Sequence, residues 1–190
     1  MLLLAHVGYT VGGGWAAQRL RLKNPVDFRL LALMAVLPDI VDRALYILVI
    51  PDAQSGRLIG HTLVFQLAVF AALVAIRRDL WIYGLASLMH LALDSHGLPP
   101  QQVLWPVLGW GLENLHIVSG SAAAAGQPYG ERVLDRLRDI SSTYAHSGPV
   151  AILFDVGGLA VLIAFTVGAR LYERRWLLLL ARRGRALTPH

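Results

Sequence analysis

Histidine and aspartate recur through the first half of the chain, where few other residues are polar. Six of them could bind a metal ion: His6, Asp39, Asp42, His61, His90 and Asp94. Imidazole nitrogen and carboxylate oxygen are donors that zinc, manganese and iron accept. The chain contains no cysteine, which excludes disulfides and thiolate ligands. The residue types therefore predict a divalent-metal site with nitrogen and oxygen ligands.

The spacing of these residues supports a shared site. Asp39 and Asp42 are three positions apart, and His90 and Asp94 are four apart. On a helix each pair lies on one face, so two facing helices could chelate the same ion. Pro38 frees a backbone carbonyl and bends its helix beside the two acids. Any one of these residues alone would more often serve helix packing, so the prediction rests on the whole set.

The composition excludes an ordinary soluble enzyme. Of the 190 residues, 56% are hydrophobic and only 15% are charged, and the mean hydropathy is +0.55. A soluble globule of this size needs far more polar surface. Lys and Arg outnumber Asp and Glu by 17 to 12, a net charge of +5. These charges lie in short clusters beside apolar segments, which indicates a membrane, and no direct nucleic-acid partner is expected.

Five apolar segments are expected to form the helices that carry the ligands: residues 1–18, 30–50, 58–76, 80–94 and 147–169. The second has about the ~20 residues needed to cross a bilayer, although Pro38 and several charges interrupt it. The first lacks formal charge and is followed by basic residues, the reverse of a signal peptide. We therefore expect it to be retained, either half-inserted or tightly packed against another helix.

The rest of the chain predicts segments at the membrane surface. Residues 97–111 contain three prolines and two tryptophans, typical of a re-entrant or interfacial segment, and residues 131–144 form an amphipathic helical pattern. The predicted fold is an all-α, polytopic membrane bundle of about four to six helices with an interfacial amphipathic helix. It forms a single domain over 1–190, with a core at 1–110, an outer interfacial segment at 111–146, and a last membrane helix and basic tail at 147–190.

The basic residues predict the orientation of the bundle. Three groups hold 12 of the 17: Arg19, Arg21, Lys23 and Arg29; Arg77 and Arg78; and Arg170, Arg174, Arg175, Arg182, Arg183 and Arg185. Lys and Arg in short loops favour the cytoplasmic side. This rule places the N-terminus outside, the C-terminal tail in the cytoplasm and the six candidate ligands in the outer leaflet.

Four sequence strings resemble the family of LexA-binding, inner-membrane-associated hydrolases, also described as membrane-bound, metal-dependent hydrolases. They are LMAVLPDIVDR (33–43), RLIGHTL (57–63), GLASLMHLALDSHGLP (84–99) and LWP (104–106), and they follow the early His6. The resemblance covers roughly residues 1–110. It implies a helical bundle in the inner membrane with a metal site at His6, Asp39, Asp42, His61, His90 and Asp94.

A more distant similarity is to zinc phosphoesterases of the phospholipase C and single-strand nuclease type. Their ligands also run His, Asp, His and His-x-x-x-Asp along helices. Those enzymes carry a second His-x-x-x-Glu or His-x-x-x-Asp, whereas here only His90 and Asp94 have that spacing. One or two ions are therefore expected instead of three. Zinc is the predicted metal, with manganese or iron as alternatives.

Together these features predict a membrane-bound, metal-dependent hydrolase of a phosphoester in a lipid-like or membrane-proximal substrate. In this hypothesis Asp42 is a bridging ligand or general base, and His96 protonates the leaving group. Arg43 or Arg57 meets the substrate phosphate. Asp155 is either a further ligand or a partner of Arg43.

Two other classes remain open at this stage. Acids within membrane segments and a broken helix are also typical of a small transporter or ion-handling protein, although no internal repeat supports that class. A non-catalytic membrane partner is the other alternative, with the polar cluster fixing helix packing and the basic tail binding anionic lipid or a regulator.

Overall fold

The chain folds into helices throughout the part that the structure, a computed structural model, describes: residues 3–20, 25–50, 53, 56–94, 97–115, 128–145, 148–170 and 174–184. The long helices are α1 (Leu3–Arg19), α2 (Phe28–Ala44), α3 (Leu63–Ile76), α4 (Trp81–Asp94), α6 (Tyr129–Ala145) and α7 (Pro149–Gly168). Two shorter ones are α5 (Pro100–Val103) and α8 (Arg174–Arg183). These described segments contain no strand, so the predicted all-α class is confirmed.

Helix α2 begins and ends as its sequence dictates. The Asp27 side chain caps it by accepting from the backbone N–H groups of Arg29 and Leu30. The Arg29 guanidinium also binds this carboxylate and holds its pKa below the usual range. Pro38 lies inside the helix, and the last turn widens into a π-helical segment, η1 (Leu45–Val49). The predicted segment 30–50 is thus one helix with an irregular C-terminal end.

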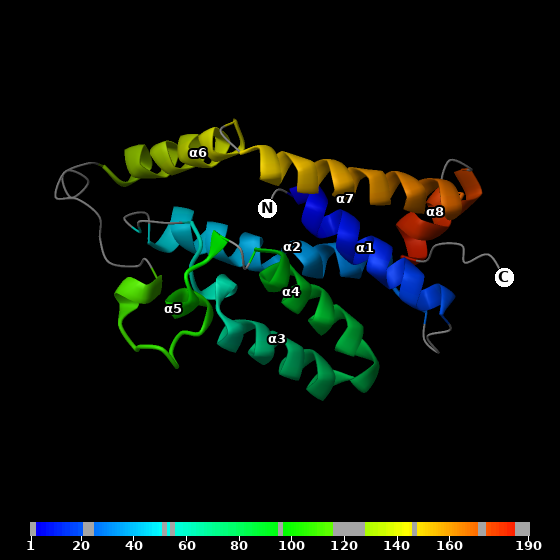
Figure 1. The fold of residues 1–190 in the computed structure, drawn as a ribbon, viewed down its shortest axis with the longest axis horizontal. Helices are drawn as coiled ribbons and strands as arrows, with labels where there is room; N and C mark the ends of the chain where they lie inside the picture. Colours follow the sequence, from blue (N-terminus) through cyan, green and yellow to red (C-terminus); the bar gives the residue numbers. More distant parts are fainter. Residues whose placement is uncertain are drawn as a thin grey trace.

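Helices α1 to α4 and α7 pack side by side and place the candidate ligands at one end of the bundle (Figure 1). α1 packs chiefly against α7, and α4 packs against both α2 and α3. The core between α1, α2, α4 and α7 includes Leu31, Met34 and Phe165, all buried. Burial of these side chains fixes the helices that carry the polar residues.

The contact between α1 and α7 depends on glycine. A Cβ on Gly8 would lie 2.2 Å from the carbonyl oxygen of Gly158, and one on Gly158 would lie 2.3 Å from that of Leu4. Gly12, four residues after Gly8, faces Val161 in the same way. This small-xxx-small spacing lets two helix backbones approach closely, as in membrane helix pairs. The first segment is therefore the tightly packed helix that was one of its two predicted forms.

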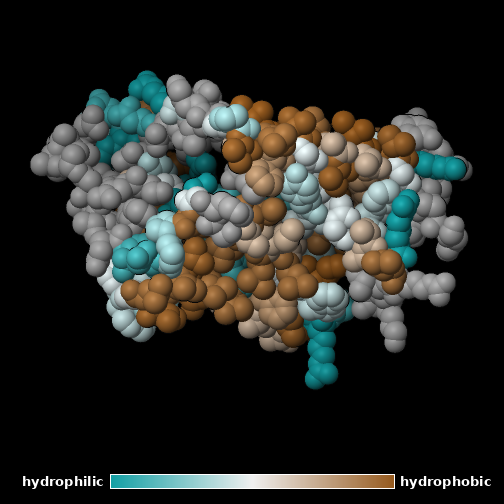
Figure 2. Space-filling model, in the orientation of Figure 1, coloured by the Kyte–Doolittle hydropathy of each residue, from teal (hydrophilic) through white to brown (hydrophobic). Residues whose placement is uncertain are grey.

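Helix α7 is the one described helix long and apolar enough to cross a membrane. It has 20 residues, and only 11% of its apolar stretch is buried within the protein. Its outward side chains include Leu153, which is 71% exposed. Figure 2 shows hydrophobic side chains over α7 and over the helices beneath it. A surface this apolar supports association with a membrane.

The peripheral segments partly follow the sequence patterns. α6 matches the predicted amphipathic helix, and Leu134 and Leu137 on its apolar face are about half exposed. The basic tail contains α8, which the sequence analysis did not predict. Gly184 ends α8 with a left-handed φ of 66°, and its carbonyl oxygen accepts from Phe28 N, so the tail docks on the start of α2.

Candidate metal centre

The candidate ligands converge from four helical segments although they are far apart in sequence. His6 comes from α1, Asp39 from α2, and His90 and Asp94 from α4. His61 ends a 3-10 turn, η2 (Ile59–His61), which precedes α3. The three histidines are fully buried, and the Asp39 side chain is 30% exposed. Two groups of three donors lie within 4.8 Å: His6, His90 and Asp94, and Asp39, His61 and His90.

Backbone contact fixes the ring of His90. Its Nδ1 donates to the carbonyl oxygen of Ala35 on α2 over 2.8 Å. The lone pair of the neutral ring is then on Nε2, which faces Asp39 and His61. Histidines that bind metals are oriented in this way, with the second ring nitrogen donating to a carbonyl or carboxylate.

A carboxylate fixes the ring of His61. Its Nδ1 lies 2.6 Å from Oδ2 of Asp42, and the same oxygen accepts from Leu58 N at 2.6 Å. Oδ1 of Asp42 accepts from Gly60 N, also at 2.6 Å. Asp42 is fully buried behind His61 and belongs to neither donor group. This differs from the expected ligand or general base, because both oxygens are bonded to the segment that carries His61.

The two fixed rings bring their Nε2 atoms to 3.3 Å from each other. With both Nδ1 atoms donating elsewhere, the lone pairs of two neutral rings would face each other and repel; a proton on one Nε2 or a metal ion between the two atoms removes this repulsion. Two nitrogen ligands of one tetrahedral zinc ion, each at ~2.0–2.1 Å from it, lie about 3.3–3.4 Å apart. Oδ1 of Asp39 is 3.6 Å from Nε2 of His61 and 3.8 Å from Nε2 of His90. The distances therefore fit one ion if the carboxylate of Asp39 moves slightly towards the two Nε2 atoms.

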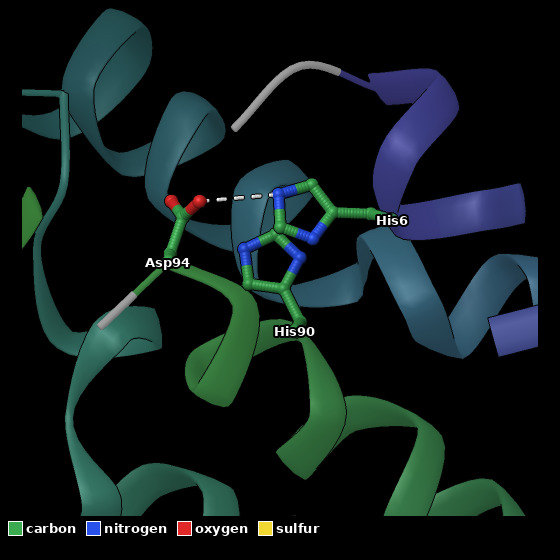
Figure 3. A group of neighbouring side chains, drawn as sticks. All are labelled: His6, His90 and Asp94. Atoms are coloured by element: carbon green, nitrogen blue, oxygen red, sulfur yellow. Dashed lines mark ion pairs between the residues drawn. The ribbon is translucent and has the colours of Figure 1, made fainter. Parts of the chain in front are cut away.

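His6 and Asp94 complete the cluster (Figure 3). The ring of His6 stacks on that of His90 with centroids 4.0 Å apart, and its Nε2 lies 3.2 Å from Oδ1 of Asp94. Oδ2 of Asp94 lies 3.5 Å from Nε2 of His61. Neither ring nitrogen of buried His6 makes a hydrogen bond within the described part of the chain. A buried polar side chain without such a bond is costly, and the ion-pair contact of Nε2 with Asp94 is the one polar contact that this ring makes among the described residues.

The turn before α3 is held by polar residues that the sequence analysis missed. Gln66 is fully buried, donates to the carbonyl oxygen of Gly60 and accepts from the Ser87 hydroxyl, each at 2.6 Å. Gln102 donates to the carbonyl oxygen of Arg57. A lone glutamine in the apolar run LVFQLAVF is the signal that could have revealed it, because a polar group buried there must find a partner.

The backbone of Gly60 passes too close to α2 for any side chain. A Cβ there would lie 2.7 Å from the carbonyl oxygen of Pro38 and 2.8 Å from Oδ1 of Asp42. Pro38 and Gly60 therefore lie together at the point where η2 joins the site. This contact explains why glycine precedes His61 in the string RLIGHTL.

The remaining predicted residues have different outcomes. Oδ1 of Asp155 accepts from Ala5 N over 2.8 Å, which satisfies a first-turn N–H of α1, so neither the predicted ligand role nor the pairing with Arg43 is seen. Arg57 lies 3.1 Å from Oδ2 of Asp94. His96 falls outside the described residues.

A cavity of about 360 Å³ opens beside the cluster between α4 and the start of α7. Arg57 and Asp94 line one side, and apolar residues of α7, including Phe154, line the other. The side chain of Arg57 is 38% exposed, whereas that of Asp94 is 2% exposed. A ligand in this cavity could therefore contact the guanidinium and reach the donor cluster.

The carboxylates of the site lie around its histidines. Asp39 and Asp42 lie beside His61, and Asp94 contacts His6, His61 and Arg57. Imidazoles and carboxylates together suit zinc, manganese or iron. The donor set therefore has the atom types, the orientation and the spacing that fit a metal ion.

Comparisons with known proteins add no further identification. No family model matches the chain, and neither the curated proteins nor the solved structures include a match. The function proposed below therefore rests on the site itself and on the sequence resemblance.

Proposed function

We propose that this protein is a multi-pass inner-membrane hydrolase that uses one divalent metal ion, zinc, to cleave a phosphoester in a lipid-like or membrane-proximal substrate. The observation that carries the proposal is the pair of Nε2 atoms of His61 and His90. They lie 3.3 Å apart, each with its Nδ1 bonded elsewhere, beside two carboxylates. The resemblance of residues 1–110 to membrane-bound hydrolases supports the same class.

One ion is favoured over two by the bonding of His90. Both donor groups include His90, but its Nδ1 is bonded to Ala35 and only Nε2 remains. Two ions would have to share that atom. His61, His90 and Asp39 would hold the ion, and Asp94 would complete the set while its other oxygen contacts His6.

The membrane placement is supported by lengths and exposed surfaces. Among the described helices α7 has both the length and the hydropathy of a membrane span, whereas α1 and α2, with 17 residues each, are less apolar and at the lower end of the ~17–25 residues that span a bilayer. Ile76 on α3 and Val167 on α7 are 71% and 60% exposed. Such side chains are stable in lipid, and with the basic loops inside, the metal site lies towards the outer leaflet.

The chain's own residues divide the work of a hydrolase between them. Arg57 binds a phosphate oxygen of the substrate in the 360 Å³ cavity. Asp42 keeps His61 in the orientation that presents Nε2. When bound, a divalent ion supplies Lewis-acid stabilisation of phosphoryl charge and lowers the pKa of water towards ~7. His96 remains our candidate for protonating the leaving group.

Metal analysis of purified protein is the first test. We expect about one transition-metal ion per chain in the wild type, because the donors already have ligand spacing. His90→Ala and Asp39→Ala should each lose it. Asp79→Ala is the matched control, since Asp79 pairs with Arg77 away from the cluster, and it should keep the ion. Metal-free wild type, or stoichiometric metal in both site variants, would contradict the proposed centre.

Turnover separates catalysis from a structural ion. Zinc-loaded protein should hydrolyse phosphate esters, including phospholipids, and lose this activity on chelation. Protein that binds zinc but cleaves none of these esters would refute the hydrolase and favour the transporter or partner alternative.

A further inference from the structure

An apolar groove of about 230 Å³ runs between α1 and α4. On α1 it is lined from Tyr9 to Ala17, and on α4 from Trp81 to Met89. Each stretch advances eight residues, or ~12 Å along its helix. Gly13 and Gly14 form part of the wall, and a Cβ on Gly13 would meet nothing within 4 Å. The missing side chain at position 13 therefore leaves open space in the groove.

The groove is open and mostly apolar. The outward residues on its α4 side are Trp81, Leu85 and Met89, which are 40%, 44% and 42% exposed. None of the described residues that line it is charged. A polar or peptide ligand would lose its hydrogen bonds there, whereas a hydrocarbon chain would lose nothing.

One end of the groove lies next to the metal centre. Ala86 is one turn before His90 on α4, and Thr10 is one turn after His6 on α1, so the groove begins ~6 Å along the helices from the stacked rings. Further along the same face of α4, Leu93 lies one turn beyond Met89 and lines the cavity that contains Arg57. The apolar groove and the charged cavity thus follow one another along α4.

We propose that the groove binds a single alkyl chain of an anionic membrane amphiphile while the headgroup occupies the cavity beside Arg57 and Asp94. This inference rests on the proposed function, because it names the substrate class of that site. The charge supports it, since the anionic phosphate of such a ligand would lie beside Arg57, while its alkyl chain would lie in a groove whose lining is mostly apolar apart from Tyr9 and Thr10. The substrate is therefore an alkyl or isoprenoid phosphate ester presented from the bilayer.

Quenching of Trp81 tests the binding directly. The protein is placed in phosphatidylcholine nanodiscs and titrated with dodecyl phosphate brominated on its chain. The wild type should show saturable quenching that is absent in Trp81→Phe, because Trp81 lines the groove. Gly13→Leu fills the groove and should abolish the saturable component. Gly130→Leu, at a second glycine with nothing within 4 Å of its Cβ, is the control and should retain it.

Three results would overturn the inference. Two of them are quenching that rises linearly with the probe concentration and saturable quenching that survives Gly13→Leu. The third is saturable quenching that a peptide or a second copy of the chain removes, although unbrominated dodecyl phosphate does not displace the probe. Linear quenching would mean simple partition into the bilayer.

An activity ratio separates this inference from the hydrolase itself. The kcat/KM for dodecyl phosphate relative to ethyl phosphate should fall by about tenfold or more in Gly13→Leu and stay constant in Gly130→Leu. An unchanged ratio in an active Gly13→Leu enzyme refutes the groove but leaves the hydrolase intact. If neither ester is cleaved, the hydrolase fails, and the quenching experiment still decides whether the groove binds the chain.

Discussion

Asp42 shows how one buried side chain determines the geometry of the whole cluster. Its two oxygens accept hydrogen bonds from Leu58 N, Gly60 N and His61 Nδ1. Asp42 therefore fixes both the η2 turn and the imidazole ring of His61. Removing an acceptor here leaves buried donors without partners, which costs roughly 1–3 kcal/mol per group. The residue is thus a positioning residue for His61 and contributes to stability as well.

Asp42→Asn should therefore weaken zinc binding by about 10–100-fold, the effect typical of losing a partner behind a metal-binding histidine. Competition with a chromophoric chelator measures the affinity, and Asp79→Asn serves as a control of equal charge change on an exposed ion pair. Saturating zinc should restore turnover in Asp42→Asn. Turnover that stays low at saturating zinc would instead support the general-base role that the sequence predicted.

Helix α7 acts on the site although it contributes no ligand. The Asp155 carboxylate accepts a hydrogen bond from Ala5 N, and Gly158 lies against Gly8. Helix α7 therefore contacts α1 on both sides of His6. The position of His6 beside Asp94 consequently depends on how closely the two backbones approach. This dependence links the helix most suited to crossing a membrane with the metal cluster.

Gly8→Ala should lower the free energy of unfolding by roughly 1–3 kcal/mol, because its Cβ would meet the Gly158 backbone, which cannot move aside without separating the helices. Gly13→Ala is the matched control: it has open space, and alanine there should stabilise the helix by about 0.5–1 kcal/mol. Thermal unfolding in detergent measures both. Equal shifts in the two variants would show that close packing at Gly8 has no energetic role.

The whole bundle separates its basic end from the end that carries the candidate metal ligands. The ends of α1 and α7 meet where Trp15 faces Gly168, and α8 docks on the start of α2 at the same end (Figure 1). The basic turn at Arg77 also lies at that end, opposite the cluster. Under the positive-inside rule this arrangement is consistent with the predicted orientation.

Cysteine labelling tests that orientation, because the native chain has no cysteine. A cysteine introduced at Gly148, next to the cavity and with open space around it, should react with an impermeant maleimide on intact cells. One introduced at Arg78 should react only after the cells are permeabilised. The reverse pattern would place the metal centre on the cytoplasmic side.

The helices and the donor types could be predicted from the sequence because both are local properties. Apolar runs and their interruptions mark α2, α3, α4 and α7 to within a few residues, and the absence of cysteine excludes thiolate as a ligand. The amphipathic pattern likewise predicts α6. Each of these features depends on neighbouring residues along the chain.

The role of each polar residue was decided only by the tertiary structure. Hydrogen bonds join Asp42 to His61, Asp155 to Ala5 N, and Gln66 to Gly60 and Ser87. The spacing of these residues along the chain does not show whether a polar side chain bonds to another residue or to a metal ion. The distances depend on how closely the helices pack, which is set by Gly8, Gly60 and Gly158. The sequence by itself determined which atoms could bind a metal; helix packing determined which of them face one another, because contacts between distant segments form only when the helices come together.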